Sequence, residues 1–341
     1  MTIDTEAAAR AVLVHGVIDR SRPDEQDTLD QVEAVGAALR RSGFDTAELA
    51  LGLDLSPLSA LANDPPALVF NLVEALAGDG RLISLPAAVM EHCGLSVTGS
   101  SAMALAVTTD KPLTKHLLAA AGLDVPQTFD ARIVGAEDES ALYIVKSVSE
   151  DASIGIDAAS VVPSGDAARE IAARRKRFGG EWFAEAFIDG REFNISLISD
   201  GKGGIEVLPA AEIRFEGFAA GRPRIVDYAA KWDPASDVYH ATPRRFVPRE
   251  AEPALVVELE RCALAAFRVL GLDGYARVDF RVDGSGRCYI LEANANPCLA
   301  PDSGFVAACA EAGMDYDMMV GRIVAARRCG ARLTAPMGAG T

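Results

Sequence analysis

The sequence lacks the features that mark nucleic-acid-binding, membrane-spanning and disulfide-stabilised proteins. It has no block of basic residues, and its formal net charge of −16 argues against binding along a phosphate backbone. No uninterrupted apolar segment is long enough to span a bilayer, and the first residues show no secretory signal. Six scattered cysteines follow neither a CxxC nor a metal-ligand spacing, as expected of reduced thiols in a cytoplasmic protein: Cys93, Cys262, Cys288, Cys298, Cys309 and Cys329.

What is present indicates a globular α/β chain of two or three domains. The chain has 341 residues, of which 50% are hydrophobic and 24% charged. Apolar runs at 11–15, 46–51 and 67–72 are typical of short strands, and they alternate with helical segments. This alternation predicts a mainly parallel α/β layer over roughly residues 1–100. A small α+β unit follows, and one last helix is predicted over about 305–328.

Residues 275–296 predict a β-hairpin with a polar face. Apolar and polar residues alternate along its first half, and Asp283-Gly284-Ser285-Gly286 supplies the turn. A register that pairs Val282 with Arg287 brings four polar side chains to one face: Arg277, Asp279, Glu292 and Asn294.

That polar face has the composition of a magnesium site. In this register Asp279 lies opposite Ile290 and diagonally from Glu292, at a spacing of about 7–8 Å that a shared cation can bridge. Two carboxylates and the amide oxygen of Asn294 suit Mg²⁺, and Arg277 would face the negative charge that the metal holds. The alternative is a solvated strand face carrying ordinary surface charges.

Taken with these residues, the chain resembles the ATP-grasp enzymes, and specifically their D-alanine–D-alanine ligase branch. The resemblance covers most of the chain and rests on motifs in the family's order and spacing: Gly78-Asp79-Gly80, Gly94-Leu95 to Thr98-Gly99-Ser100, Asp110-Lys111, Ala121-Gly122-Leu123, Ile144-Val145-Lys146, Glu185, Gly190 to Glu192-Phe193, Lys231, Arg277 to Asp279, and Leu291-Glu292-Ala293-Asn294 to Pro297.

The resemblance implies a three-domain ATP-grasp fold. It places an N-terminal α/β substrate domain at 1–100 and a central ATP-grasp subdomain at 101–187. A C-terminal subdomain with an antiparallel sheet and the metal site follows at 188–330, and a mobile tail at 331–341. ATP would bind between the central and C-terminal sheets, and the family implies a homodimer.

The resemblance also assigns the phosphates of ATP. Lys111 and Lys146 would neutralise the α- and β-phosphates as flexible point charges. Loop 149–155, including Ser153 and Gly155, would close over the β- and γ-phosphates through backbone N–H groups. The alternative for either lysine is an ordinary surface residue, which we favour less than phosphate binding.

The nucleoside end is assigned in the same way. Glu185, Phe187 and Glu192 would line the nucleotide, with the glutamates on the adenine edge and the ribose hydroxyls. Without the resemblance, either glutamate is equally an edge-strand charge.

The implied chemistry joins a small-molecule carboxylate to an amine through an acyl phosphate, with release of ADP and phosphate. Mg²⁺, or Mn²⁺ in its place, would be held by the hairpin residues. The catalytic side chains would be Arg277 for the oxyanion, Lys231 for the γ-phosphate, and Ser153 in the loop.

The substrate side departs from the family. The family's glycine- and serine-rich turn with a Glu for the first substrate's amine is replaced by residues 14–20, so Glu74 becomes the candidate for that amine; a capping or surface role is its alternative. Cys298 stands where the family has an oxyanion-hole glycine, and we favour a packed thiol there over a nucleophile. Ser303 and Gly304 match the position that receives the second substrate's carboxylate.

We therefore expect an ATP-dependent carboxylate–amine ligase whose substrate is not two D-alanines. Three alternatives stay open: D-alanine–D-alanine ligase itself, an ATP-grasp kinase, and a nucleotide-binding module without catalysis. The last disagrees with the intact set of lysines and hairpin residues.

Overall fold

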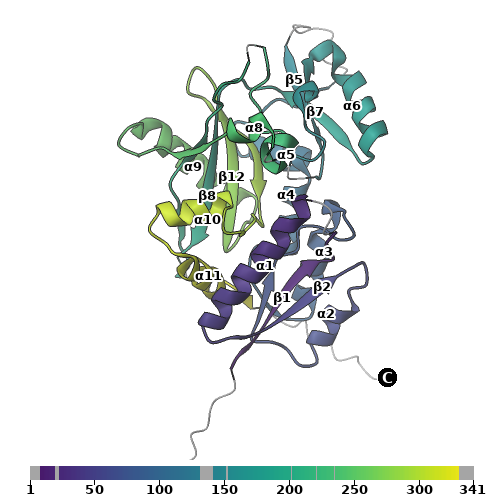
Figure 1. The fold of residues 1–341 in the computed structure, drawn as a ribbon, viewed down its shortest axis with the longest axis vertical. Helices are drawn as coiled ribbons and strands as arrows, with labels where there is room; N and C mark the ends of the chain where they lie inside the picture. Colours follow the sequence, from purple (N-terminus) through teal and green to yellow (C-terminus); the bar gives the residue numbers. More distant parts are fainter. Residues whose placement is uncertain are drawn as a thin grey trace, which may run out of the picture.

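The computed structural model consists of three β-sheets with helices packed against them (Figure 1). The expected tail at 331–341 lies outside the described residues. Within the described part of the chain, no helix is both long and apolar enough to cross a membrane. The structure describes residues 8–19, 23–130, 141–150, 153–200, 202–219, 221–233 and 235–329.

The first sheet has the order β14-β4-β3-β1-β2 and is parallel except at β14, which pairs antiparallel with β4. Successive residues of β1 belong to two hydrophobic cores on opposite faces of the sheet. Leu13 is in the core that contains Val35 of α1, and Val14 is in the core that contains Met90 of α3. Both faces are therefore covered, as in most parallel sheets. The elements are β1 Arg10–Gly16, α1 Pro23–Arg41, β2 Asp45–Leu51, α2 Ser56–Leu61, β3 Leu68–Asn71, η1 Gly80–Leu82, α3 Ser84–His92, β4 Ser96–Val97 and β14 Arg328–Cys329.

The second sheet is a small antiparallel unit of order β6-β5-β7, covered by α6. Two helices precede it, and each begins at a side-chain cap, Ser101 for α4 and Asp110 for α5. The elements are α4 Ala102–Thr109, α5 Lys111–Ala120, β5 Leu142–Ser147, η3 Ala158–Ser160, β6 Val161–Pro163, α6 Ser164–Phe178 and β7 Trp182–Ala186.

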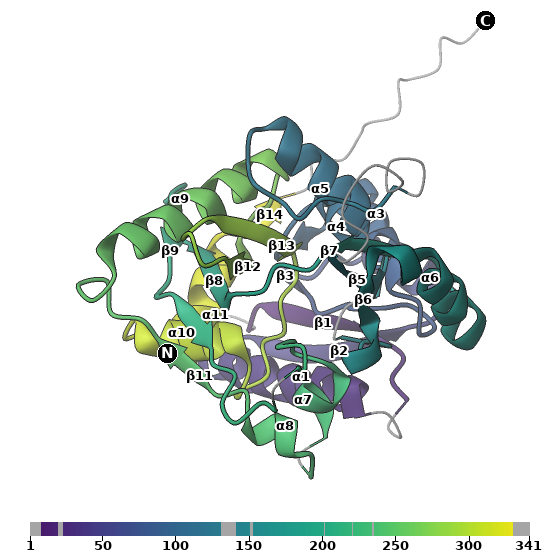
Figure 2. The same cartoon turned by 90° about the horizontal axis from the view of Figure 1, so that it is seen from above.

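The third sheet is antiparallel, with the order β11-β10-β8-β12-β13 and β9 paired with β8. Figure 2 shows α9 on one side of this sheet and α10 with α11 on the other. An Arg41–Asp317 ion pair of 2.5 Å joins α11 to α1 of the first unit. The elements are β8 Arg191–Ser199, β9 Ile205–Val207, β10 Ala211–Ile213, α7 Tyr228–Trp232, α8 Asp237–His240, β11 Arg244–Phe246, α9 Pro253–Val269, β12 Tyr275–Val282, β13 Cys288–Asn294, α10 Gly304–Glu311 and α11 Tyr316–Ala325.

The hairpin of β12 and β13 is present, but the predicted register at its turn is wrong. Val282 pairs with Cys288 rather than with Arg287. The turn is longer because the Asp283 carboxylate accepts hydrogen bonds from the backbone N–H groups of Ser285 and Arg287. This side-chain capping of the loop adds one residue to the connection.

A β-bulge shifts the register by one more residue towards the site. The pairing shifts between Asp279 and Phe280, so that Asp279 lies directly opposite Glu292 and Arg277 opposite Asn294. The extra residue, Leu291, lies on β13, where Leu291 and Glu292 are both partly exposed between buried Ile290 and Ala293. The regular alternation of β12 carries no sign of it. The two carboxylates consequently lie closer than the predicted diagonal.

The predicted single helix over 305–328 is two helices. Gly313, with φ of +79°, ends α10, and the Asp315 side chain accepts from the Met318 N–H to begin α11. The break needs a left-handed residue that glycine supplies without steric cost.

Candidate active site

One cavity of about 650 Å³ is lined by residues from all three units. It lies where the third sheet's polar face meets the second sheet and the segment after β3. The predicted site residues that line it are Glu74, Lys111, Lys146, Ser153, Glu185, Phe187, Glu192, Lys231, Arg277, Asp279, Glu292, Asn294, Cys298, Ser303 and Gly304; Gly155 is the predicted residue that does not.

Asp279 is the centre of the polar hairpin face. Arg277 donates to both of its carboxylate oxygens, Nε to Oδ1 at 2.8 Å and Nη2 to Oδ2 at 2.9 Å. Asn194 of β8 donates to Oδ1 at 2.8 Å and Asn294 of β13 to Oδ2 at 3.4 Å. Three neighbouring strands therefore fix this one carboxylate, which is 7% exposed.

Charge around the two facing carboxylates is strongly positive. Burial raises the pKa of Asp279 above its ordinary value, although Arg277 opposes the shift. Burial also acts against the charge of Glu292, but Lys111 and Lys231 outweigh it and hold its pKa well below the usual range. Glu292 is thus kept ionised beside a cluster of cations.

This donor set restricts what metal chemistry is available. No group of three or more His, Cys, Asp or Glu side chains suited to a metal occurs among the residues that the structure describes. Asp279 and Glu292 would therefore need Asn294 as a third protein ligand. Oxygen-only ligands of this kind match a hard cation such as Mg²⁺.

Glu185 of β7 is not the isolated carboxylate that its sequence context suggests. It is fully buried, with its two oxygens 2.8 Å from Lys115 Nζ and 2.9 Å from Lys146 Nζ. Burial opposes ionisation, but the two lysines lower its pKa below the usual value. Lys146 and Glu185 both line the cavity.

Lys115 is a site residue that sequence reasoning missed. It follows Lys111 by one helical turn on α5 and is 2% exposed. Its Nζ also donates to the Leu291 carbonyl oxygen at 2.6 Å, next to Glu292. The available signal was its i,i+4 spacing from Lys111, which places both lysines on one helix face.

The loop after β5 is fixed by backbone geometry and by one buried arginine. Ser153 has a positive φ of 59°, and its hydroxyl donates to the Val226 carbonyl oxygen at 2.8 Å. Gly155 also has a positive φ, and a Cβ there would lie 2.6 Å from the Trp182 ring, so that only glycine fits. The remaining loop positions, 151 and 152, lie outside the described residues.

Residues 174–177 of α6 form a basic run, which is most often a solvated face, but Arg174 is buried. Arg174 is 3% exposed and donates to the Gly155 carbonyl oxygen at 2.5 Å and to Asp157 at 2.6 Å. It also pairs with Glu170 one turn earlier on α6. Because a run of like charges does not reveal which member faces inward, the sequence did not separate Arg174 from its exposed neighbours.

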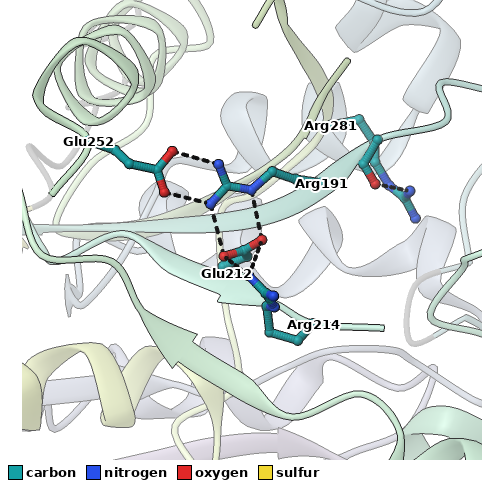
Figure 3. Close-up of polar contacts among 6 residues, drawn as sticks. Arg191, Glu212, Arg214, Glu252 and Arg281 are labelled. Carbon is teal, nitrogen blue, oxygen red and sulfur yellow. Dashed lines mark hydrogen bonds and ion pairs between the residues drawn. The ribbon is translucent and has the colours of Figure 1, made fainter. Parts of the chain in front are cut away.

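Ion pairs also fix the end of β8 that carries Glu192. Arg281 of β12 donates to Glu192 at 2.7 Å inside the cavity. Behind it, Arg191 bridges Glu212 at 2.8 Å and Glu252 at 2.6 Å (Figure 3). Neighbouring residues of one strand thus point to opposite faces, with Glu192 towards the nucleotide end and Arg191 in a structural network.

The first-substrate end of the cavity is built around Glu74. Gln31 of α1 donates to Glu74 at 2.6 Å and accepts from the Leu299 backbone N–H at 3.1 Å. Cys298 lines the cavity beside this chain of contacts, and burial raises the pKa of its thiol, which favours a packed neutral group over a nucleophile.

The second-substrate end lies at the start of α10. The Ser303 hydroxyl caps this helix and accepts from the Val306 N–H at 3.4 Å. Gly304 borders the cavity next to Arg244 of β11. Sequence reasoning did not single out Arg244.

Comparison with known proteins identifies the family. The family model described as "D-ala D-ala ligase C-terminus" matches residues 130–325. A protein named D-alanine–D-alanine ligase from Chromohalobacter salexigens is 36% identical over 92% of this chain and 93% of its own. Another of that name from Acidiphilium cryptum is 30% identical over 94% and 98%. The chain belongs to the D-alanine–D-alanine ligase family.

The solved structures agree on the fold. The crystal structure of D-alanine–D-alanine ligase from Bacillus anthracis has a TM-score of 0.72 to this chain, at 23% identity over 94% of this chain and 97% of that one. The predicted ATP-grasp fold is confirmed, and the protein is an ADP-forming ATP-grasp ligase. The expected domain bounds stay a prediction.

Proposed function

We propose that this enzyme joins two molecules of D-alanine with ATP as the energy source. The names of the relatives from Chromohalobacter and Acidiphilium support this choice, since their matches extend over almost the whole chain. The observation that carries the ligase chemistry is the convergence of Arg277, Asp279, Glu292 and Asn294 with three lysines in one cavity.

The roles within the cavity follow from charge and position. Lys111, Lys146 and Lys231 would bind the phosphates of ATP, and Glu185, Phe187 and Glu192 its nucleoside. Arg277, held flat against Asp279 by two hydrogen bonds, would stabilise negative charge that develops on the reacting carboxyl group.

Mg²⁺, with Mn²⁺ as a substitute, fits the oxygen donors of Asp279, Glu292 and Asn294. Two carboxylates that face each other among cations favour a site whose charge is balanced by a metal ion and phosphates together. When bound, the ion would neutralise phosphate charge during transfer.

The proposed reaction has two steps on the substrate side. The carboxylate of the first D-alanine attacks the γ-phosphorus and forms an acyl phosphate, and the amine of the second D-alanine then displaces phosphate. Glu74 would hold the amine of the first substrate, and Cys298 would border the site with its backbone N–H. Ser303 and Gly304 would receive the carboxylate of the second.

The test is an incubation with ATP, Mg²⁺ and D-alanine, in which ADP is measured and the product identified by mass. We expect one D-alanyl-D-alanine for each ADP, and no product from L-alanine. ADP release without a dipeptide, or no ADP release at all, would contradict the proposal.

A second candidate is a ligase for another pair of amino acids. The comparisons give no support to our expectation that the substrate is not two D-alanines. The sequence at 14–20 nevertheless departs from the family's glycine- and serine-rich turn, and Glu74, to which Gln31 donates, lines the cavity. The same assay with a panel of amino acids separates the two candidates, and a stable phosphorylated substrate would instead indicate a kinase.

Two further expectations belong to this proposal. The homodimer rests on the family alone. The cytoplasmic location rests on the scattered cysteines, of which five are free among the described residues.

A further inference from the structure

Arg244 lies at the second-substrate end of the cavity on an edge strand. It pairs with Ile213 across β11 and β10, and both residues line the cavity. The next residue, Arg245, pairs with Glu212 and does not line it. Because successive strand residues point to opposite faces, Arg244 faces the cavity and Arg245 faces away.

The guanidinium of Arg244 borders the position expected to receive a carboxylate. A Cβ placed on Gly304 would lie 3.4 Å from its Nη2 atom. Any group bound against Ser303 and Gly304 is therefore within reach of Arg244. Ser303 itself lines the same cavity.

Arg244 differs from the other two arginines that line the cavity in its ion-pair partners. Arg277 holds Asp279 and Arg281 holds Glu192. Within the part of the chain that the structure describes, no carboxylate forms an ion pair with Arg244. Its partial burial and the charge of Arg277 lower its pKa, and only Asp302 acts in the opposite direction. A bound anion at this position would favour the charged guanidinium and so oppose both the burial and the repulsion from Arg277.

We propose that Arg244 binds the carboxylate of the amine-bearing substrate and so determines that this substrate is an amino acid rather than a simple amine. A planar guanidinium suits this role because it binds a carboxylate through two parallel hydrogen bonds. This inference rests on the proposed function, since it assumes that the second substrate enters beside Ser303.

The test compares two acceptors for the acyl phosphate. With D-alanine, the amine nitrogen attacks the acyl carbon, the bond from that carbon to the phosphate oxygen breaks, phosphate leaves and the nitrogen loses a proton. Hydroxylamine reacts in the same way and gives a hydroxamate, but it has no carboxylate to bind. Only the first acceptor should depend on Arg244.

For Arg244→Gln we expect kcat/KM for D-alanine as acceptor to fall about 10- to 100-fold, as for loss of a hydrogen bond between charged groups. Hydroxamate formation should stay within about twofold of wild type by the same reasoning. Arg244→Lys should recover part of the loss by keeping the charge. The matched control is Arg245→Gln, which removes an exposed arginine from the same strand and should change neither acceptor.

Equal losses with both acceptors, or no loss with D-alanine, would overturn the role of Arg244. If the wild-type enzyme forms neither product from D-alanine, the proposed function fails instead. The comparison then uses an amino acid that supports hydroxamate formation, supplied as both donor and acceptor. Equal losses with this amino acid and with hydroxylamine, or no loss with the amino acid, would again overturn the role of Arg244.

Discussion

Replacing Lys115 with Met should destabilise the protein and weaken ATP binding together. Lys115 and Glu185 are 2% and 0% exposed, and their ion pair of 2.8 Å links α5 to β7. The methionine side chain keeps most of the lysine's volume but removes its charge. Glu185 then keeps Lys146 as its single cationic partner, and Leu291 loses a hydrogen bond to its carbonyl oxygen.

The expected size follows from the cost of an incompletely paired buried charge. Removing one partner of a buried ion pair costs about 3–5 kcal/mol, whereas replacing both with apolar or neutral groups is often close to neutral. Since Lys146 still compensates the charge of Glu185, we expect Lys115→Met to lower the free energy of unfolding by about 3 kcal/mol. The double variant Lys115→Met, Glu185→Gln should recover most of that loss.

The assay is urea unfolding of the ATP-free protein followed by circular dichroism, with the ATP KM measured in parallel. Lys176→Met, on the exposed face of α6, is the control for removing a lysine and should leave both values unchanged. A Lys115→Met midpoint equal to wild type, or a double variant no more stable than the single one, would refute the argument from buried charge.

Three further predictions concern the site itself. Asp279→Asn and Glu292→Gln should each abolish ADP release while the thermal melting curve stays cooperative; normal turnover in both would remove the metal assignment. Arg277→Lys should lower kcat by about 10- to 100-fold and change the ATP KM much less, because the bidentate geometry is lost but the charge is kept. Equal effects on kcat and on the ATP KM would indicate that Arg277 only contacts the nucleotide. Arg174→Gln should raise the ATP KM about tenfold, since the carbonyl of Gly155 and the carboxylate of Asp157 lose a charged donor, whereas Arg175→Gln on the exposed side of α6 should not.

Local patterns in the sequence were sufficient for individual elements, whereas the ATP-grasp fold followed from the resemblance of the motifs. The alternation along β12, the caps before α4 and α5, and the apolar run of β1 each predict an element without knowledge of its neighbours. What these patterns did not supply are features that depend on a partner strand. The bulge beside Asp279 is of this kind, because it is defined by the pairing of two strands. The break at Gly313 is local instead, marked by a glycine of positive φ and the Asp315 cap, and the apolar spacing alone did not reveal it.

The same distinction applies to the site. Glu292 and Asn294 were found through their motif, and the cavity collects them with Asp279. Lys115 and Arg174 were missed because each stands in a sequence context typical of a solvated helix face, and only tertiary packing buries it. Burial of a charged residue is decided by the carboxylates and carbonyl groups it meets, and those come from other elements.

The two ends of the cavity are built on different principles, and this explains why one end was easier to predict. At the nucleotide and metal end, Asp279 is tied to Arg277, Asn194 and Asn294 across three adjacent strands, so a change in one residue disturbs the others. At the substrate end, Glu74 follows β3 and Arg244 lies on the edge strand β11, so neither belongs to the three strands that hold Asp279. We therefore expect substitutions at Glu74 or Arg244 to change kcat/KM for the amino acid substrates more than the ATP KM, and equal changes in both quantities would contradict this separation.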